Sequence, residues 1–335
     1  SAARAATALA RQSMSMNLLQ QLTAKVKSRT RPARVVFPEA EDERVLRAAS
    51  LFQTYGLGDA LLVGKRENIE QAISAADLGG SDLTIIDTAD NPKAEDYVLR
   101  YLEIRPGGNP KVARRLVTRA LYHAALMVGA GDADSLVAGA ATPTGRVIEA
   151  ALLGIGLASG IETPSSFFLM QIPDFLGEGP KDFIYADCAV NVEPDASQLA
   201  DIAIASASSA QALLREPPRV AMLSFSTQGS AQHAAVEKVR TALAIARDKA
   251  PELEIDGEFQ ADTAIIPRVA GTKLRAPSPV AGEANVLVFP DLNSGNIAYK
   301  LTQYMAGANA YGPFLQGFAR PLSDLSRGAT VDDIL

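Results

Sequence analysis

Short apolar runs rich in β-branched residues alternate with helical patterns along most of this chain of 335 residues. The segments 220–223 and 286–289 are apolar at every position, which indicates strands that are buried on both faces, as in a mostly parallel sheet. Strands that alternate with helices favour right-handed crossover units. The pattern therefore predicts an α/β fold.

The alternation gives an expected position for each element. We expect strands at 34–37, 59–64, 83–87, 135–139, 166–171, 183–187, 219–226, 254–258, 284–290 and 312–316. We expect an acidic helix start at 39–43 and helices at 67–76, 93–104, 111–129, 147–160, 196–214, 234–250 and 295–305.

The length of the chain suits two domains of ordinary size. The boundary that we expect lies near Glu162-Thr-Pro164, after a Gly-rich helical stretch. Domain I is expected to take in residues 17–158 and 318–335, and domain II residues 159–317. Two αβα lobes with a cleft between them are the predicted architecture.

The first 38 residues hold seven Lys and Arg residues and no acidic residue. This composition is typical of a transit peptide. The alternative is a tag remnant or a disordered upstream extension at 1–16, with a natural start at Met14 or Met16. No apolar run reaches the length of about 18 residues that a membrane span needs. We therefore expect a cytoplasmic protein that binds no membrane.

Composition excludes several kinds of chemistry. A single cysteine rules out a disulfide framework and a cysteine-based metal site, and two histidines leave little room for a histidine metal centre or a Ser-His-Asp system. We therefore expect no metal. The formal net charge of −6 argues against a nucleic-acid-binding protein.

A first candidate site is the loop 224–233, which leaves an apolar strand and enters a helix. Small polar residues in it, Ser226, Thr227, Gly229 and Ser230, allow main-chain N–H groups to turn toward an anion at the helix N-terminus. No Gly-Lys-Ser/Thr sequence ends the loop, so it is not a Walker loop. The alternative is an ordinary loop that caps the helix.

A second strand-to-helix turn follows at 289–297. Here Asn293 or Ser294 is a candidate helix cap, and Gly295 would allow a ligand to approach closely. Capping alone is the alternative interpretation.

The third candidate is the C-terminal stretch 321–333. Ser326, Arg327 and Gly328 bring together a hydroxyl, a guanidinium and a glycine, which suit a phosphate or a developing oxyanion. Thr330 and Asp333 have the spacing of a capping box. Asp333 is thus either a capping carboxylate or a general base, and the spacing by itself favours the cap.

Arg105 stands at the end of an expected helix, before Pro106-Gly-Gly108. It would bind an anion in the cleft or, alternatively, interact with the helix dipole in solvent. His123 is interpreted as a packed or a surface histidine, and Cys188 as a small buried apolar residue.

Six segments in order resemble those of the phosphate acetyl/butyryltransferases, and of the phosphate acetyltransferases (phosphotransacetylases) in particular. They are FIYADCAVN at 183–191, VAMLSFSTQGSA at 220–231, IDGEFQ at 255–260, SPVAG at 278–282, ANVLVFPDLNSGN at 284–296 and LSRG at 325–328. The resemblance runs from about residue 17 to the end.

This resemblance implies two αβα domains of the isocitrate-dehydrogenase-like type, an active site in the cleft between them and a homodimer. It also implies the reversible reaction of acetyl-CoA with inorganic phosphate to give acetyl phosphate and CoA, with CoA as a substrate and no tightly bound cofactor. Ser326 corresponds to the family's catalytic serine, Arg327 to its phosphate-handling arginine and Asp333 to the carboxylate that deprotonates the thiol. Arg105 matches an arginine after the corresponding helix.

One position departs from the family's pattern. Where relatives carry an arginine in a Thr-Ala-Asp-x-x-Arg-Pro-Ala-Leu motif, this chain has Glu149, with Arg146 three residues earlier. Arg146 would supply the positive charge from one turn away.

Three other functions compete with acetyl transfer. A phosphate butyryltransferase, or another acyl specificity, would use the same scaffold. A non-catalytic acetyl-CoA-sensing domain is the second alternative, although the Ser-Arg-Gly sequence favours catalysis. A nucleotide-dependent dehydrogenase is the third, but no Gly-x-Gly-x-x-Gly fingerprint follows a strand.

Overall fold

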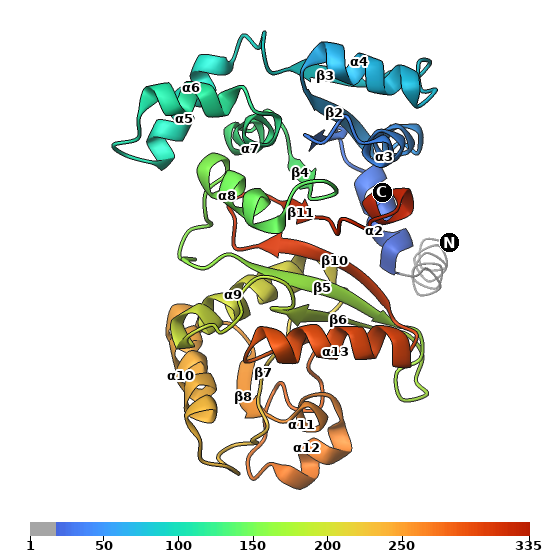
Figure 1. Ribbon diagram of the computed structural model, residues 1–335. Coiled ribbons are helices and arrows are strands. Elements are labelled where there is room, and N and C mark those ends of the chain that lie inside the picture. Colours follow the sequence, from blue (N-terminus) through green and yellow to red (C-terminus); the bar gives the residue numbers. More distant parts are fainter. Residues whose placement is uncertain (1–17) are drawn as a thin grey trace, which may run out of the picture. The chain divides into compact units, whose positions relative to one another are not determined.

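The computed structural model describes residues 18–335, so the extension expected at 1–16 lies outside the described residues (Figure 1). The chain forms two compact units: one holds residues 18–143 together with Ser326–Leu335, and the other is Thr144–Leu325. The domain limits expected from the sequence, at 158/159 and 317/318, differ from these and stay a prediction.

Four parallel strands make the sheet of the first unit. In chain order they are β1 (Ala33–Phe37), β2 (Gly58–Gly64), β3 (Thr84–Asp87) and β4 (Ser135–Ala138), and they lie in the order β3-β2-β1-β4. β4 pairs with β1 on the side away from β2. Because β1 and β4 are adjacent and parallel, their carboxyl ends lie next to each other at the same edge of the sheet.

Helices cover both faces of this sheet. They are α2 (Leu18–Lys27), α3 (Glu43–Thr54), α4 (Arg66–Ala75), α5 (Ala94–Ile104), α6 (Pro110–Val117), α7 (Ala120–Ala130) and the short α14 (Val331–Ile334). Right-handed crossovers place α3 and α4 on one face, while α7 packs against β1, β2 and β4 on the other.

Two helix starts differ from the expectation. The acidic stretch expected to begin a helix at residue 39 is a loop, because Asp42 caps α3 by accepting a hydrogen bond from the N–H of Arg44. The single helix expected at 111–129 is two helices, because Arg119 is extended between α6 and α7.

The second unit contains a mixed sheet. Its strands are β5 (Ser165–Ile172), β6 (Lys181–Ala186), β7 (Val220–Leu223), β8 (Ile255–Phe259), β9 (Val286–Val288), β10 (Asn309–Gln316) and β11 (Leu322–Asp324). The order within this unit is β11-β10-β5-β6-β9-β7-β8. The pairs β6–β9, β9–β7 and β7–β8 are parallel, whereas β5, β6, β10 and β11 pair antiparallel with one another.

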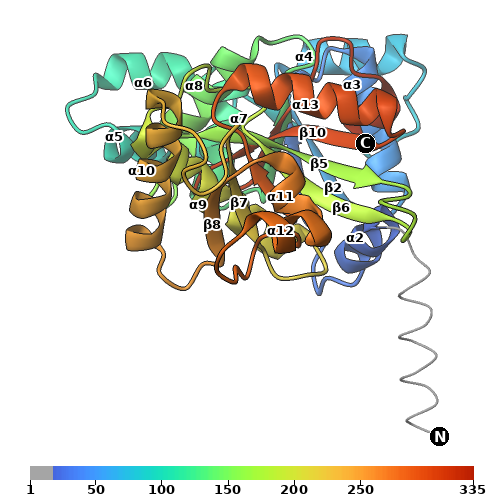
Figure 2. The same cartoon turned by 90° about the horizontal axis from the view of Figure 1, so that it is seen from below.

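The helices of the second unit are α8 (Thr144–Gly154), α9 (Ala196–Leu213), α10 (Ala234–Lys249), α11 (Ala261–Ile265), α12 (Pro267–Lys273) and α13 (Leu292–Met305). Right-handed crossover connections place α9 and α10 on one face of this sheet and α11 to α13 on the other. The long helix α13 runs along β5 and β10 (Figures 1 and 2). The α/β fold predicted from the sequence is confirmed.

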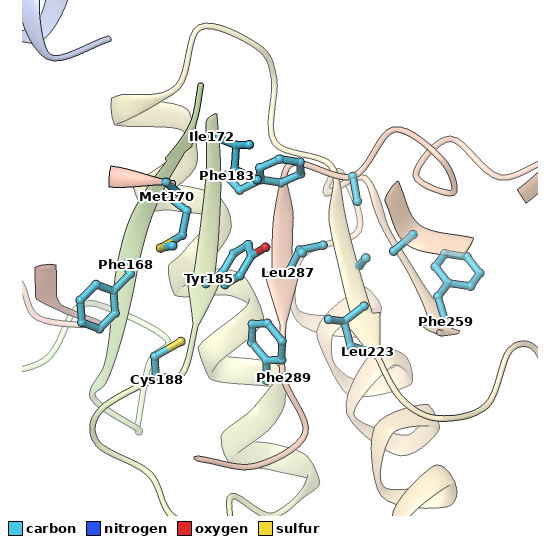
Figure 3. Close-up of a cluster of buried hydrophobic side chains, with 14 of the residues drawn as sticks. Phe168, Met170, Ile172, Phe183, Tyr185, Cys188, Leu223, Phe259, Leu287 and Phe289 are labelled. Atoms are coloured by element: carbon cyan, nitrogen blue, oxygen red, sulfur yellow. The ribbon is translucent and has the colours of Figure 1, made fainter. Parts of the chain in front are cut away.

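A cluster of buried side chains lies on the face of this second sheet that α13 covers (Figure 3). Phe168 of β5 stacks on Tyr299 of α13 with ring centroids 4.1 Å apart, and Tyr185 of β6 meets Phe289 at 5.3 Å. Cys188 is fully buried in the cluster, where burial raises the pKa of its thiol well above the usual value. The packing interpretation of this cysteine is therefore confirmed.

Within residues 18–335, no helix is both long enough and apolar enough to cross a membrane.

Candidate active site

The segment that follows the second unit in the chain belongs to the first unit, and it opens with an exposed turn at Ser326, Arg327 and Gly328. The N–H of Ala329 donates to the main-chain oxygen of Ser326 at 2.9 Å, and the N–H of Gly328 donates to Ser326 Oγ at 3.3 Å. Among the described residues, the guanidinium of Arg327 has no hydrogen-bond or ion-pair partner. The turn thus presents a hydroxyl and a free cation to solvent, a combination that suits an anionic oxygen.

Asp333 lies in the short helix that follows this turn. Its Oδ2 accepts hydrogen bonds from the N–H and the hydroxyl of Thr330, both at 2.8 Å, and its own N–H donates to Thr330 Oγ1 at 3.2 Å. The capping box predicted from the spacing is confirmed. The Asp333 side chain is exposed, and its Oδ1 makes no hydrogen bond within residues 18–335. One carboxylate oxygen therefore caps the helix while the other faces solvent.

Arg105 is the C-cap residue of α5, at the start of the turn closed by the hydrogen bond from the N–H of Gly108 to the Arg105 oxygen. Its side chain is exposed and has no partner in the part of the chain that the structure describes. An interaction with an anion thus stays a prediction that the geometry permits.

The loop 224–233 is built around a buried carboxylate that the sequence analysis missed. Glu258, which is 1% exposed at the end of β8, accepts from the hydroxyl of Ser226 at 2.8 Å and from the N–H of Gly229 at 2.7 Å. Ser230 Oγ accepts from the N–H of Thr227 at 3.0 Å. The groups expected to cradle an external anion therefore satisfy one another and an internal anion.

At the second strand-to-helix turn, 289–297, the residue that caps the helix is neither of the two that we expected. Asp291, rather than Asn293 or Ser294, caps α13 by accepting from the N–H of Ser294 at 2.8 Å, because it is the last residue with extended backbone before the helix. Asn293 is exposed in the first turn. A Cβ on Gly295 would lie 2.2 Å from the main-chain oxygen of Asp187, so this glycine lets the helix approach a neighbouring loop.

Since β7 and β9 are adjacent parallel strands, the loop 224–233 and the start of α13 leave the sheet at the same edge. The structure therefore brings together the two candidate segments of the second unit.

Arg146 and Glu149 form an ion pair on the first turns of α8, with Nη1 and Oε2 2.8 Å apart. The side chains are 63% and 45% exposed, so solvent screens the pair. The Glu149 carboxylate is thus paired with Arg146, the arginine that was expected to supply the positive charge at this position.

Two further buried or half-buried acids organise loops at strand ends. Asp187, after β6, accepts from the N–H groups of Ala189 and Asn191 at 3.0 and 2.9 Å. Glu39, after β1, accepts from four consecutive N–H groups of residues 139–142 at 2.7–3.0 Å. Both acids stand close after a buried strand, and this position could have marked them in the sequence. The partners of Glu39 could not be predicted in this way, because they lie about one hundred residues away in the chain.

Of the two interpretations of His123, packed or at the surface, the structure shows the first. His123 is fully buried, its Nε2 lies 2.8 Å from the side-chain nitrogen of Asn91 and its Nδ1 2.8 Å from the main-chain oxygen of Val117. Burial lowers the pKa of the imidazole. Nδ1 therefore donates to the carbonyl and Nε2 accepts from the amide in the neutral ring.

Residues 18–335 contain no group of three or more His, Cys, Asp and Glu side chains that could hold a metal ion.

Comparison with known proteins decides the family. Residues 17–335 match the sequence profile of the family described as phosphate acetyl/butaryl transferase. The chain belongs to this family.

Two kinds of relative agree with membership of the phosphate acetyl/butaryl transferase family. The phosphate acetyltransferase of Acetivibrio thermocellus is 43% identical over 322 residues, which is 96% of each chain. A crystal structure of a phosphotransacetylase from Streptococcus pyogenes superposes with a TM-score of 0.85 at 37% identity and covers 95% of this chain and 94% of that one. The structure of EutD phosphotransacetylase from Staphylococcus aureus superposes with a TM-score of 0.84 at 39% identity, with the same coverage of both chains. As a member of this family, the chain is an acyltransferase, and neither a sensing domain nor a dehydrogenase is favoured.

Proposed function

We propose that the chain catalyses the reversible transfer of an acetyl group between CoA and inorganic phosphate. The observation that carries the proposal is the exposed Ser326-Arg327-Gly328 turn followed by a half-free Asp333 carboxylate. It occurs in a chain that is 43% identical, over nearly its full length, to a phosphate acetyltransferase. CoA and acetyl-CoA then act as substrates, with no resident cofactor.

The reaction in the direction of acetyl-CoA needs a thiolate, an electrophilic carbonyl carbon and donors for the developing oxyanion. A thiol has a pKa of about 8.5 and a free aspartic acid about 3.9, so proton transfer between them is uphill by roughly 6 kcal/mol. The thiolate must therefore be consumed as it forms, by attack on an acyl carbon already held in place.

Each residue of the turn suits one of these needs. Ser326 donates a hydrogen bond to the carbonyl oxygen as it becomes an oxyanion. Arg327, whose guanidinium is free, binds the phosphate group. Asp333 accepts the thiol proton at the Oδ1 that faces solvent. The thiolate attacks the acetyl carbon directly in a ternary complex, the carbon–oxygen bond to phosphate breaks, and phosphate leaves without an acyl-enzyme.

Further anion contacts are proposed for Arg105 and Asn293. Both are exposed, and neither side chain has a partner among the residues that the structure describes. Arg146 is the third candidate, with its charge partly offset by Glu149. Thr227 and the rest of the loop 224–233 are supported less, because their donors already serve Glu258 and one another.

The decisive test is phosphate-dependent release of free thiol from acetyl-CoA by the purified protein. We expect release that saturates in both substrates and yields acetyl phosphate in equal amount. Thiol release without phosphate would indicate a hydrolase, and no release from folded protein would overturn the proposal.

Acetyl selectivity is tested by comparing kcat/KM for acetyl and butyryl phosphates, and we expect acetyl phosphate to be preferred. Glu149→Arg is measured alongside, because it removes the carboxylate that faces Arg146. A lower KM for CoA or acetyl phosphate in this variant would support anion binding at α8. A preference for butyryl phosphate would favour the alternative acyl specificity.

We also propose a homodimer that uses the exposed face of α13. Ile297, Leu301, Tyr304 and Met305 lie at helical spacing along this helix and are 52–81% exposed. A contiguous apolar stripe of this kind is typical of an interface. Light scattering should give twice the chain mass for the wild type, and Leu301→Asp should shift it toward the monomer.

A cytoplasmic location is proposed with the reaction, because the chain has a single cysteine and no disulfide framework. Fractionation of source cells, with thiol release as the assay, tests it.

A further inference from the structure

Arg44, in the first turn of α3, has an acceptor for every N–H group of its guanidinium. Nε and Nη2 donate to the two oxygens of Asp42 at 3.1 and 2.7 Å, and Nη2 also donates to the main-chain oxygen of Ala140 at 3.1 Å. Nη1 donates to the main-chain oxygens of Arg327 at 2.8 Å and Ala329 at 2.9 Å. A guanidinium has five such donors, so none remains for a ligand.

We propose that Arg44 is a positioning residue that sets the main-chain conformation of the turn carrying Ser326 and Arg327. This inference rests on the proposed function. The two Nη1 bonds reach the carbonyls of the 327–328 and 329–330 peptide planes, so they fix the direction of two peptide planes in this turn, and the first of them adjoins Gly328. The Cα atom of Arg327 lies in the first of these planes, so the Arg327 side chain starts from a fixed position on the turn.

Asp42 explains why the guanidinium itself is held still. Its Oδ1 caps α3 through the N–H of Arg44 at 2.9 Å and also accepts from Arg44 Nε. The hydrogen bond from the guanidinium to Asp42 raises the pKa of Arg44 further. The helix start, the carboxylate and the guanidinium plane therefore form one rigid group.

The third carbonyl ties this group to a second loop. Ala140 belongs to the stretch 139–142, whose N–H groups all donate to the carboxylate of Glu39. Glu39 and Arg44 follow β1, and residues 139–142 follow β4, its parallel neighbour. Arg44 thus joins the turn at 326–329 to the carboxyl edge of the first unit's sheet.

A role for Arg44 in binding a substrate anion is the competing explanation. Lysine separates the two, because it keeps the positive charge but has three donors on one nitrogen instead of a planar fork. Arg44→Lys would retain part of an anion contact, whereas it could not bond to Asp42 and to three carbonyls together.

The test compares Arg44→Lys with Arg47→Lys as a matched control on the same helix. Arg47 bonds to Glu43 and to the main-chain oxygen of Ala76, not to the turn at 326–329. Steady-state thiol release gives kcat and both KM values, and hydrogen exchange of the peptide covering 324–335 reports on the turn without reference to activity.

We expect Arg44→Lys to lower kcat by about 10²-fold, with each KM changed less than about threefold, as for a misplaced catalytic group. Exchange at 326–330 should rise in this variant and stay unchanged in Arg47→Lys. Guanidinium ion added to Arg44→Ala should recover part of the lost kcat.

Several outcomes would overturn the inference. They are a kcat near the wild-type value in Arg44→Lys, unchanged exchange at 326–330, or a rise in one KM that accounts for the whole loss of kcat/KM. Failure of the proposed function is distinguished by the wild type, which would then release no thiol, while the exchange comparison would still test whether Arg44 holds the turn.

Discussion

The N–H of Gly229 donates to the buried carboxylate of Glu258 at 2.7 Å. The same carboxylate oxygen accepts from the hydroxyl of Ser226, which is itself fully buried. The sequence of the loop 224–233 suggests an anion-binding loop, but its donors bind the carboxylate of Glu258 from the same chain. Its charge is partly balanced by Arg240, whose Nε lies 3.9 Å from the other oxygen.

Glu258→Ala should destabilise the protein by about 2 kcal/mol, because it leaves the buried Ser226 hydroxyl without its carboxylate acceptor, at about 1–3 kcal/mol, and also removes the acceptor of the exposed Gly229 N–H. Glu258→Gln keeps one acceptor oxygen and should lose less. Urea denaturation measures both, with Glu237→Ala on the exposed face of α10 as the control. Unchanged stability in Glu258→Ala, together with a raised KM for CoA, would show that the loop serves a ligand instead.

Ser326→Ala should lower kcat by about 10²-fold or more if the hydroxyl donates to the oxyanion. Stability should change little, since the side chain is exposed and, within residues 18–335, its oxygen accepts only the N–H of Gly328, at 3.3 Å. A rapid-quench experiment with labelled acetyl phosphate provides the check. Accumulation of a labelled acyl-enzyme would make the serine a nucleophile and refute direct attack.

Asp333→Asn should lower kcat strongly with a modest change in KM, because asparagine has no basic oxygen for the thiol proton. The carbonyl oxygen of asparagine can still accept from Thr330, so thermal stability should hardly change. Asp332→Asn, at the adjacent exposed position in the same helix turn, is the control. Equal kcat in the two variants would leave Asp333 with the capping role alone.

Acid should destabilise the protein through His123. Burial holds the pKa of this imidazole below its unfolded value of about 6.5, so the unfolded state binds more protons below that pH. The contribution of His123 is therefore present above about pH 6.5 and is lost as the pH falls toward its folded pKa.

Denaturation from about pH 7.5 down to about pH 5 would measure this dependence, and His123→Leu should flatten it while lowering stability throughout. His233→Gln serves as the control, because His233 is exposed and caps α10. A slope in His123→Leu equal to that of the wild type would place the acid sensitivity elsewhere.

Strands could be predicted from the sequence because continuous apolar runs reveal burial without knowledge of partners. The expected strand at 59–64 corresponds to β2 at Gly58–Gly64, and that at 166–171 to β5 at Ser165–Ile172. The break between α6 and α7 was missed, because apolar periodicity continues across the extended residue Arg119. The capping box of Thr330 and Asp333 was predicted from its spacing, whereas the equally local cap of α13 was assigned to Asn293 or Ser294 instead of Asp291, because several residues that can cap a helix stand close together there.

The exposed residues of the candidate site could be predicted from the sequence. The residue that we propose positions them could not. Ser326 and Arg327 stand in a recognisable motif, and the structure places both at the surface of the first unit. Arg44 bonds to carbonyls more than 280 residues further along the chain, and a carbonyl is the same for every residue type. No pattern in the sequence could therefore indicate that contact.

The first unit is completed by a segment from the far end of the chain. A ribosome makes all of the second unit before it makes Ser326, and domains generally fold as they emerge. The turn can join α3 and the edge of the first sheet only after both units have been synthesised. A nascent chain that has completed only the second unit therefore has no activity toward acyl phosphates in the proposed mechanism, because Ser326, Arg327 and Asp333 are translated after that whole unit.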